Sequence, residues 1–234
     1  MRLARRAGSS RAEDKEHFWL PRLAPQLPLA IPVPVARGRP GAGYPWFWSV
    51  VTWLPGETPV GDPVRADELA GFIAALQGID ASGAPEPGAQ RGLPLSTRAP
   101  RVEAALRRID APGAAGLWER AVRVPECRRA PVWLHADLDA RNVLVEHGRL
   151  TGVIDWGCLG AGDPAVEVMS AWKLLGRDER DRFRALLAVD DATWLRAEGW
   201  ALSQALIALD YYTLETYPLL VREAERWLFE VLAS

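Results

Sequence analysis

The chain has 234 residues, of which 49% are hydrophobic and 25% charged, and its formal net charge is −2. This composition is typical of a soluble globular protein and lacks the basic excess that nucleic-acid-binding domains usually carry. We also expect no membrane span, because no run of about 18 apolar residues is present. Arg2, Arg5 and Arg6 are not followed by the apolar run of a secretory signal, which favours a cytoplasmic protein. Cys127 and Cys158 have no zinc-type spacing, so we expect reduced thiols.

The first quarter of the chain predicts a helix followed by strands. Residues 12–24 predict a short helix that ends near Pro21 or Pro25. The Pro- and Gly-rich residues 26–46 predict an extended segment, a strand and a tight turn. β-branched and aromatic residues predict a strand at 46–54. The sequence PGETP then breaks this strand, and we expect a domain boundary there.

The remainder of the chain is mainly helical in its pattern. Leu69, Phe72, Ile73 and Leu76 fall at i, i+3, i+4 and i+7 and predict a helix that ends at Gly78. The later predictions are a loop at 80–100, a weaker helix at 102–109, strands at 143–145 and 150–154, and helices at 164–175, 178–188, 193–213 and 221–231. The order therefore predicts a helix with strands, followed by a helical body into which a hairpin is inserted.

Polar residues flank the two strands of this predicted hairpin instead of lying within them. Asn142 comes just before the first strand and Asp155 just after the second, so the hairpin would return both side chains to the same edge. Asp137 lies on the preceding loop, where a carboxylate can accept a hydroxyl proton. Two converging oxygen donors with an acid nearby are what phosphoryl transfer with Mg²⁺ requires.

Two other interpretations of these residues compete with phosphoryl transfer. Asp and Asn also occur in turns and caps for purely local reasons. A hydrolytic metal site built from His135, Asp137 and Asp139 is a further alternative.

The motifs resemble a known family. HADLDARN at 135–142, followed by IDWG at 154–157, resembles the catalytic and metal-binding loops of the aminoglycoside phosphotransferase family, which is kinase-like. GAGDP at 160–164 and WLPGE at 53–57 also resemble that family, the latter its inter-lobe hinge. The resemblance implies an α/β (α+β) fold of the two-lobe protein-kinase type.

The resemblance also implies how the lobes are divided. Residues 1–55 would form the N-terminal nucleotide-binding lobe and hinge, and residues 56–234 a helical C-terminal lobe with the catalytic and metal-binding loops. The family carries two strands and a glycine- or serine-rich loop before the strand that holds its phosphate-binding basic residue. Because this chain begins MRLARR, we expect a truncated N-terminal lobe.

The resemblance gives three residues a role in the transfer itself. Asp137 would be the catalytic base, or the group that orients the acceptor hydroxyl. Asn142 and Asp155 would bind Mg²⁺. His135 would be structural and support the loop.

Other residues would hold the nucleotide. The backbone of Thr52, Trp53 and Leu54 would bind the purine edge of ATP or GTP. Arg2 would be the phosphate-binding basic residue, and Glu16 its partner on the following helix. For Glu16 a solvated helix face is an equally simple explanation, and terminal arginines such as Arg2 are usually just solvated.

The sequence departs from the family pattern at two places in the loops. Ala136 replaces the usual glycine, which is tolerable if its φ is negative. Glu167 stands where the family often has aspartate after the GDP motif, and we expect its longer side chain only to shift a structural hydrogen bond.

The acceptor is harder to read from the sequence. In the family, acidic residues near the C-terminus receive cationic acceptors, and the corresponding acids here are Asp210, Glu215, Glu223, Glu225 and Glu230. An ordinary solvated helix face accounts for these acids better. Tyr211, Tyr212 and Tyr217 would either line an acceptor pocket or simply pack.

The function expected from the sequence is ATP- or GTP-dependent, Mg²⁺-dependent phosphorylation of a hydroxyl on a small molecule, aminoglycoside-like or another metabolite. We expect no nucleic-acid partner and no membrane partner. The alternative is a catalytically degenerate kinase-like binding protein, or a fragment of a longer enzyme.

Overall fold

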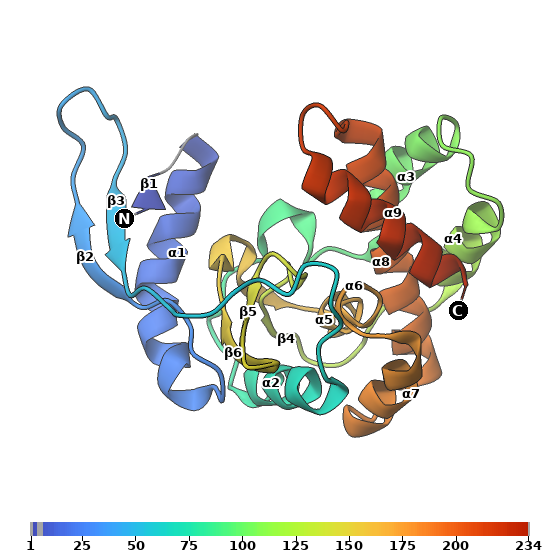
Figure 1. The fold of residues 1–234 in the computed structure, drawn as a ribbon, viewed down its shortest axis with the longest axis horizontal. Coiled ribbons are helices and arrows are strands. Elements are labelled where there is room, and N and C mark those ends of the chain that lie inside the picture. Colours follow the sequence, from blue (N-terminus) through green and yellow to red (C-terminus); the bar gives the residue numbers. More distant parts are fainter. Residues whose placement is uncertain (1, 4–6, 234) are drawn as a thin grey trace.

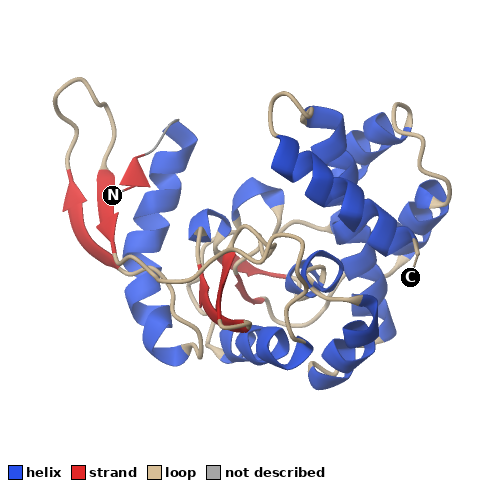
Figure 2. Ribbon diagram, in the orientation of Figure 1, coloured by secondary structure: helices blue, strands red, loops and turns tan. Residues whose placement is uncertain are grey.

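A computed structural model describes the backbone of residues 2–3 and 7–233, and the side chains of Leu3 and residues 13–233. A small sheet with one long helix lies at one end, and a larger, mainly helical body lies at the other (Figures 1 and 2). The fold class is therefore the expected mixture of helices and strands. The assignment of residues 1–55 and 56–234 to two separate lobes stays a prediction.

The described residues form seven strands, nine α-helices and four short 3-10 helices. The strands are β1 (Arg2–Leu3), β2 (Pro34–Gly38), β3 (Trp48–Val51), β4 (Val132–Leu134), β5 (Val143–Glu146), β6 (Arg149–Val153) and β7 (Gly160–Gly162). The helices are α1 (Ala7–Leu23), α2 (Ala66–Gly78), α3 (Ala99–Leu106), α4 (Ala114–Arg123), α5 (Ala165–Val168), α6 (Ala171–Leu174), α7 (Arg177–Leu186), α8 (Asp191–Tyr211) and α9 (Pro218–Leu232). Short 3-10 turns occur at η1 (Ala24–Gln26), η2 (Gly88–Gln90), η3 (Leu95–Arg98) and η4 (Trp156–Cys158).

The N-terminal sheet has the strand order β1-β3-β2, with both pairs antiparallel. Helix α1 is joined to the sheet by a hydrogen bond of 2.8 Å between His17 Nε2 and Ser49 Oγ. The predicted start of this helix at residue 12 is wrong, because the helix begins at Ala7. Lys15 Nζ also donates to the Leu159 carbonyl at 2.9 Å, so α1 is fastened to the helical body as well.

The β5–β6 hairpin is held on both sides by segments that flank the small sheet. Ala30 bonds to β6 through Thr151 O and the Val153 N–H, at 3.0 and 2.9 Å. Glu57 and Val145 of β5 exchange backbone hydrogen bonds of 3.0 and 2.8 Å. The hairpin that ends in the predicted site is thereby fixed to the chain on either side of the hinge.

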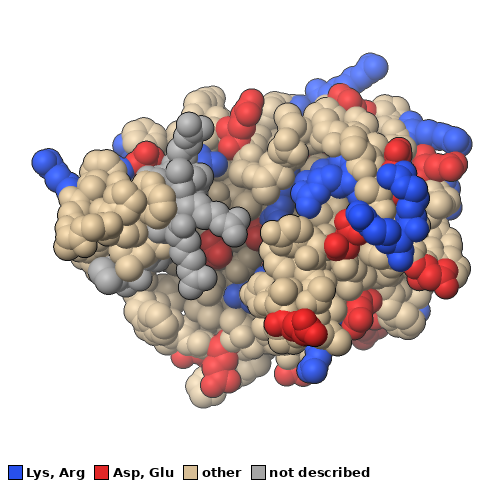
Figure 3. Space-filling view, turned by 90° about the horizontal axis from the view of Figure 1, so that it is seen from above, with Lys and Arg blue, Asp and Glu red and all other residues tan. Residues whose placement is uncertain are grey.

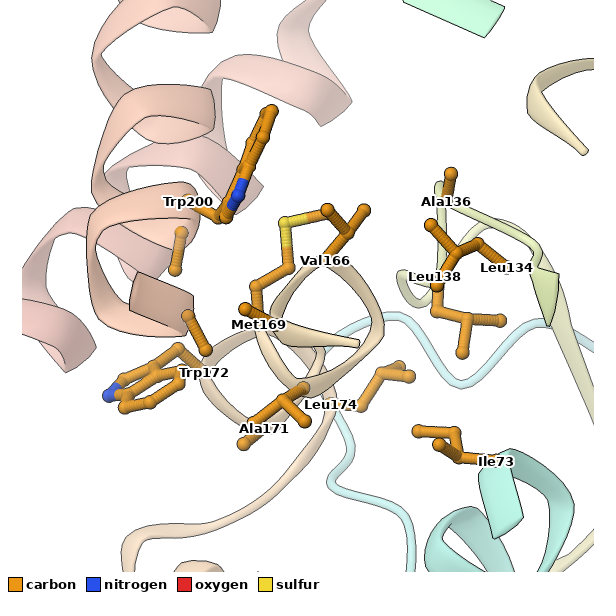
Figure 4. Packing of buried hydrophobic residues seen from close by; sticks show 14 of the residues in the cluster. Ile73, Leu134, Ala136, Leu138, Val166, Met169, Ala171, Trp172, Leu174 and Trp200 are labelled. Carbon is orange, nitrogen blue, oxygen red and sulfur yellow. The ribbon is translucent and has the colours of Figure 1, made fainter. Parts of the chain in front are cut away.

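A continuous hydrophobic core runs from Leu20 of α1 to Val231 of α9. Figure 4 shows its centre, where Met169, Trp172 and Trp200 pack between α8 and the α5–α6 segment. Helix α8 begins with a side-chain cap, since Asp190 accepts a hydrogen bond from the Thr193 N–H at 2.6 Å. This core supports the polar loops from beneath.

Most of the large aromatic residues serve this packing. Trp133, Trp156, Trp172 and Trp200 are at most 1% exposed, whereas Trp53 in the predicted hinge is 92% exposed. Cys127 and Cys158 are free thiols. None of the described helices has the length and apolar character needed to cross a membrane.

The structure corrects the predicted helix at 164–175. It is split into α5 and α6, because Ser170 Oγ donates to the Glu167 carbonyl at 2.6 Å and the backbone there forms shorter-range bonds. Helix α4 and the paired strands β4 and β7 were not predicted, and the glycine-containing β7 is a strand only through its pairing with β4.

Close packing at Gly160 leads to a stability prediction. A Cβ at this position would overlap the backbone of Pro87, whereas a Cβ at Gly71 in α2 would meet nothing within 4 Å. Gly160→Ala should lower the free energy of unfolding by about 1–3 kcal/mol. Gly71→Ala, the control, should raise it by about 0.5–1 kcal/mol because alanine is the better helix former. Denaturant unfolding measures both, and equal effects would contradict the described packing.

Candidate active site

The open end of the β5–β6 hairpin carries two residues with oxygen-bearing side chains, Asn142 and Asp155. Val143 pairs with Val153, and the Ile154 N–H donates to the Asn142 carbonyl at 2.8 Å. Asn142 thus lies beside the strand that leads directly into Asp155. Asn142 is 7% exposed, while Asp155 is exposed and has left-handed backbone angles, φ 59° and ψ 66°. This is the convergence that the predicted hairpin requires.

The loop before the hairpin ties Asp137 to Asn142. Asn142 Nδ2 donates to the Asp137 carbonyl at 2.8 Å, and the Asn142 N–H donates to the Asp139 carbonyl at 2.9 Å. Because the amide nitrogen is used in this way, the side-chain oxygen Oδ1 is the atom that can serve as a ligand.

His135 is a structural bridge between the loop of Asp137 and that of Asp155. Its ring is fully buried; Nε2 bonds to the Ile154 carbonyl at 2.9 Å, and Nδ1 accepts the Asp137 N–H at 3.2 Å. This pattern assigns the proton to Nε2 of a neutral imidazole. Burial lowers the pKa of His135, in keeping with the neutral form.

Glu167 holds the backbone beneath Asp137. Its Oε1 accepts the Ala136 N–H at 2.5 Å, and the side chain is fully buried. Burial raises the pKa of Glu167 to about 7, against the lowering effect of the backbone donors at Ala136 and His135. Ala136 has φ 66°, so the condition of a negative φ, under which alanine would be tolerable here, is not met. The left-handed conformation, in which the family uses glycine, is retained although alanine occupies it.

The carboxylate of Asp137 is charged and held in place by cations. Arg91 Nη1 lies 2.5 Å from Asp137 Oδ1 and donates to the Ala136 carbonyl, also at 2.5 Å. Burial by itself would raise the pKa of Asp137, but the charges of Arg91 and Lys173 outweigh it and bring the pKa to about 2. Asp137 is therefore ionised throughout the physiological pH range.

Asp139 has a different role from Asp137. It is fully buried and paired with Arg141, whose Nη2 lies 2.5 Å from Oδ2. His135 and Asp139 thus have other partners, which argues against the alternative of a hydrolytic metal site. Among the described residues, no group of three or more His, Cys, Asp or Glu side chains could hold a metal ion.

The pair Asn142 and Asp155 fits Mg²⁺ by the chemistry of its donors. Mg²⁺ prefers oxygen ligands, takes one or two from protein side chains, and completes its shell with phosphate oxygens and water. An amide oxygen next to an exposed carboxylate offers this set.

Glu16 lies against the same turn. It is 4% exposed, so the alternative of a solvated helix face does not hold. A Cβ built on Gly157 would be 3.5 Å from Asp155 Oδ1 and 3.9 Å from Glu16 Oε1, which places the Glu16 carboxylate beside the IDWG turn. The backbone of Arg2 pairs with Ser49 in the sheet, and its side chain lies outside the described part of the structure.

The predicted hinge crosses from the small sheet to the hairpin. The Thr52 N–H donates to the Val33 carbonyl at 2.9 Å, and Leu54 packs toward Gly152 of β6. Within the described chain, no backbone hydrogen bond uses the N–H groups of Trp53 and Leu54. These donors are therefore available to a purine edge.

A cavity of about 670 Å³ opens next to Asp137. Its walls come from the loop at 89–91, α3, the loop of Asp137, and helices α8 and α9 with their connection. Tyr211, Tyr212 and Tyr217 line it and contact one another edge to face, with ring centroids 4.8 and 5.6 Å apart. The tyrosines therefore both line the cavity and pack against one another.

The acidic residues of the C-terminal helices do not line this cavity. Asp210 pairs with Arg108 at 2.6 Å, and Glu223 pairs with Arg226 at 2.7 Å. Glu230 pairs with Arg180 at 2.6 Å. These three acids are engaged with arginines, and Glu223 is only 5% exposed, so an ordinary solvated helix face does not describe it.

Sequence reasoning missed Arg91 and Lys173. Arg91 belongs to a segment predicted only as a loop, and it reaches Asp137 because this segment bonds to β7 through Pro85 O and the Ala161 N–H, at 2.9 Å. Lys173 is fully buried beneath the site. Its only sequence signal is rarity, since Lys15 and Lys173 are the lysines of the chain.

Comparisons with known proteins agree with this geometry. The sequence profile of the Phosphotransferase enzyme family matches residues 1–200. Uncharacterized protein YcbJ of Bacillus subtilis (strain 168) is 28% identical over 162 residues, which are 66% of this chain and 52% of that protein. The chain thus spans about half the length of this curated relative.

Solved structures share the fold. Macrolide 2'-phosphotransferase MphH from Brachybacterium faecium aligns with a TM-score of 0.63 and 22% identity, over 95% of this chain and 83% of that one. The GDP complex of wild-type aminoglycoside 2'-phosphotransferase-IIIa aligns with a TM-score of 0.66 and 18% identity, over 98% and 84%. These similarities confirm the predicted kinase-like fold class.

The buried Glu167 carboxyl leads to a pH prediction. The unfolded chain ionises this group near its ordinary value of 4.5, and the folded chain only near 7, so wild type loses stability as pH rises through that window. Glu167→Gln keeps an acceptor for the Ala136 N–H and carries no charge. From pH 5 to pH 8 it should gain up to about 3 kcal/mol relative to wild type. Thermal unfolding against pH measures this gain, and a constant difference between the two proteins would contradict it.

Proposed function

Because the chain belongs to the Phosphotransferase enzyme family, we propose that it transfers the terminal phosphoryl group of ATP or GTP to a hydroxyl of a small molecule. The observation that supports the proposal is that three polar residues lie on adjoining segments. Asn142 and Asp155 lie at the open end of one hairpin, and the loop of Asp137 is bonded to Asn142. This combination provides an acid for the acceptor and oxygen ligands for a metal bound to phosphates.

Asp137 orients the acceptor hydroxyl and takes its proton. The hydroxyl oxygen bonds to the terminal phosphorus, the bond from phosphorus to the bridging oxygen breaks, and nucleoside diphosphate leaves. A carboxylate with a pKa of about 2 is a weak base for a free alcohol. The proton therefore moves late, when the new bond to phosphorus has made the hydroxyl acidic, as suits a loose transition state. The contribution of Asp137 is chiefly position.

The nucleotide would lie between the hinge and the hairpin end. The backbone of Thr52, Trp53 and Leu54 would form hydrogen bonds with the edge of the purine base. Asn142 and Asp155 would hold Mg²⁺, which neutralises phosphate charge when it is bound. Solved structures of phosphotransferases in complex with ADP, GDP or ATP share this fold and support a nucleotide donor.

Replacing the acid tests this assignment. Asp137→Asn keeps the size of the side chain and removes its charge and its ability to accept the proton. Transfer from γ-labelled ATP or GTP to a panel of hydroxyl acceptors should fall at least ~100-fold. Calorimetric nucleotide affinity should stay within about twofold of wild type, because Asp137 is not assigned to the nucleotide.

The matched control is Asp181→Asn, an exposed acid on α7 that should leave transfer unchanged. Transfer by Asp137→Asn at close to the wild-type rate would contradict the role of Asp137. A folded wild-type chain that binds neither nucleotide would contradict the proposed function and favour the catalytically degenerate binding protein.

A further inference from the structure

The cavity beside Asp137 is lined by positive charge. Arg91, Arg98, Arg101 and Arg141 all line it, and Asp137 is the acidic residue among the described residues of its wall. Seen from above, several Lys and Arg side chains lie on the helical body, with Asp and Glu side chains beside them (Figure 3). A polycationic acceptor would meet repulsion here, so the cavity selects for a different charge.

Two of these guanidinium groups are neutralised by acids of the loop. Arg91 is paired with Asp137 at 2.5 Å, and Arg141 with Asp139 at 2.5 Å. These pairs fix the loop geometry. The other two arginines of the wall, Arg98 and Arg101, take no part in these ion pairs.

Arg98 is buried without an acidic partner. It is 7% exposed, and within the described chain it forms no ion pair or hydrogen bond; its Nε is enclosed and unpaired. Burial, together with the charges of Arg91 and Arg101, lowers the pKa of Arg98 to about 10. The exposed Arg101 follows one turn later on α3 and lines the same cavity. A buried cation beside further cations is costly unless an anion joins it.

Other residues of the wall also carry unused donors. Gln204 Nε2 and Trp227 Nε1 are buried without a hydrogen-bond partner among the described residues. The orientation of the Gln204 amide is fixed, because Lys173 Nζ can only donate and bonds to Gln204 Oε1 at 2.8 Å. The wall thus combines two cations that have no acidic partner with buried N–H groups that no described residue satisfies.

We propose that this cavity binds a hydroxyl-bearing acceptor with an anionic group, a carboxylate or a phosphate, held by Arg98 and Arg101. The inference rests on the proposed function for the fate of the acceptor hydroxyl, which faces Asp137. The tyrosine wall suits a ring or a polyol chain between the hydroxyl and the anionic group. The volume of about 670 Å³ is that of a typical small-molecule site.

The anion site is distinct from the nucleotide site. Asn142, Asp155 and the hinge residues Thr52, Trp53 and Leu54 are absent from the described lining of the cavity. Asp137 lies at the cavity wall and is bonded to Asn142 through its carbonyl, so it stands at the border between donor and acceptor. An anion bound by Arg98 should therefore not compete with the nucleotide.

The first test measures anion binding by the full chain. Sulfate stands in for a phosphate group and tartrate for a hydroxy-carboxylate, each titrated at constant ionic strength with saturating Mg²⁺ and a non-hydrolysable ATP analogue. Wild type should bind at least one of the two probes. Arg98→Met should weaken that affinity at least tenfold without lowering the melting temperature, because it removes a buried charge whose contact is with the Trp200 ring, 5.7 Å from the guanidinium carbon, and not with an acid.

A second variant and a control keep this result interpretable. Arg101→Gln changes an exposed residue, so this variant should fold even if Arg98→Met does not. It should also weaken anion affinity. Arg123→Met, on α4 and outside the cavity, should leave it unchanged. Binding that is indifferent to Arg98 and Arg101, or that competes with the nucleotide, would overturn the inference.

The second test compares acceptors that differ chiefly in charge. Phosphoryl transfer is measured to glucose, glucosamine, glucuronate, glucose 6-phosphate and kanamycin. Preference for glucuronate or for glucose 6-phosphate supports the inference and identifies the anionic group. Preference for glucosamine or kanamycin, unchanged in Arg98→Met, would overturn it and leave the proposed function standing. Anion binding that depends on Arg98, without transfer to any acceptor or binding of nucleotide, would support the anion site and contradict the proposed function.

Discussion

The imidazole of His135 joins the loop that carries Asp137 to the turn that carries Asp155. Its two nitrogens bond to the Ile154 carbonyl and the Asp137 N–H, so the ring fixes the spacing between the two loops. Because the ring is buried and neutral, this spacing does not depend on pH in the physiological range. Glu167 then accepts a hydrogen bond from the Ala136 N–H. Arg91 donates to the Ala136 carbonyl and forms an ion pair with the Asp137 carboxylate. The position of the reactive carboxylate follows from this sequence of contacts.

Charge divides the site into two halves. On the hairpin side, Asp155 and Glu16 present carboxylates where a metal with phosphates would bind. On the cavity side, Arg98 and Arg101 present cations that no described acid neutralises. Asp137 lies between them and is held ionised by Arg91 and Lys173. A metal–phosphate donor and an anionic acceptor would therefore approach Asp137 from surfaces of opposite charge, which separates their binding sites.

The sequence predicted the site residues that come together through one local element. It did not predict the residues whose contacts depend on tertiary packing. Asn142 and Asp155 meet through one hairpin, and strand alternation with turn residues is enough to see that. The positive φ of Ala136 could not be seen in the sequence, because the buried carboxyl of Glu167 holds its N–H from a helix far along the chain. Arg91 and Arg98 lie in segments without periodicity, and their contacts depend on how that loop packs against β7 and α8. The unpaired state of Arg98 is a property of its surroundings, which no spacing in the sequence encodes.

The measurement that tests the site most directly is calorimetric titration of ATP and GTP, with and without Mg²⁺, into wild type and Asp155→Ala. If Asn142 and Asp155 hold the metal that carries the phosphates, nucleotide binding by wild type needs Mg²⁺, and the variant loses this dependence together with most of its affinity. A melting temperature of the variant equal to that of wild type would show that the substitution leaves the fold intact. Equal affinity in the two proteins, or binding by wild type that ignores Mg²⁺, would contradict the account.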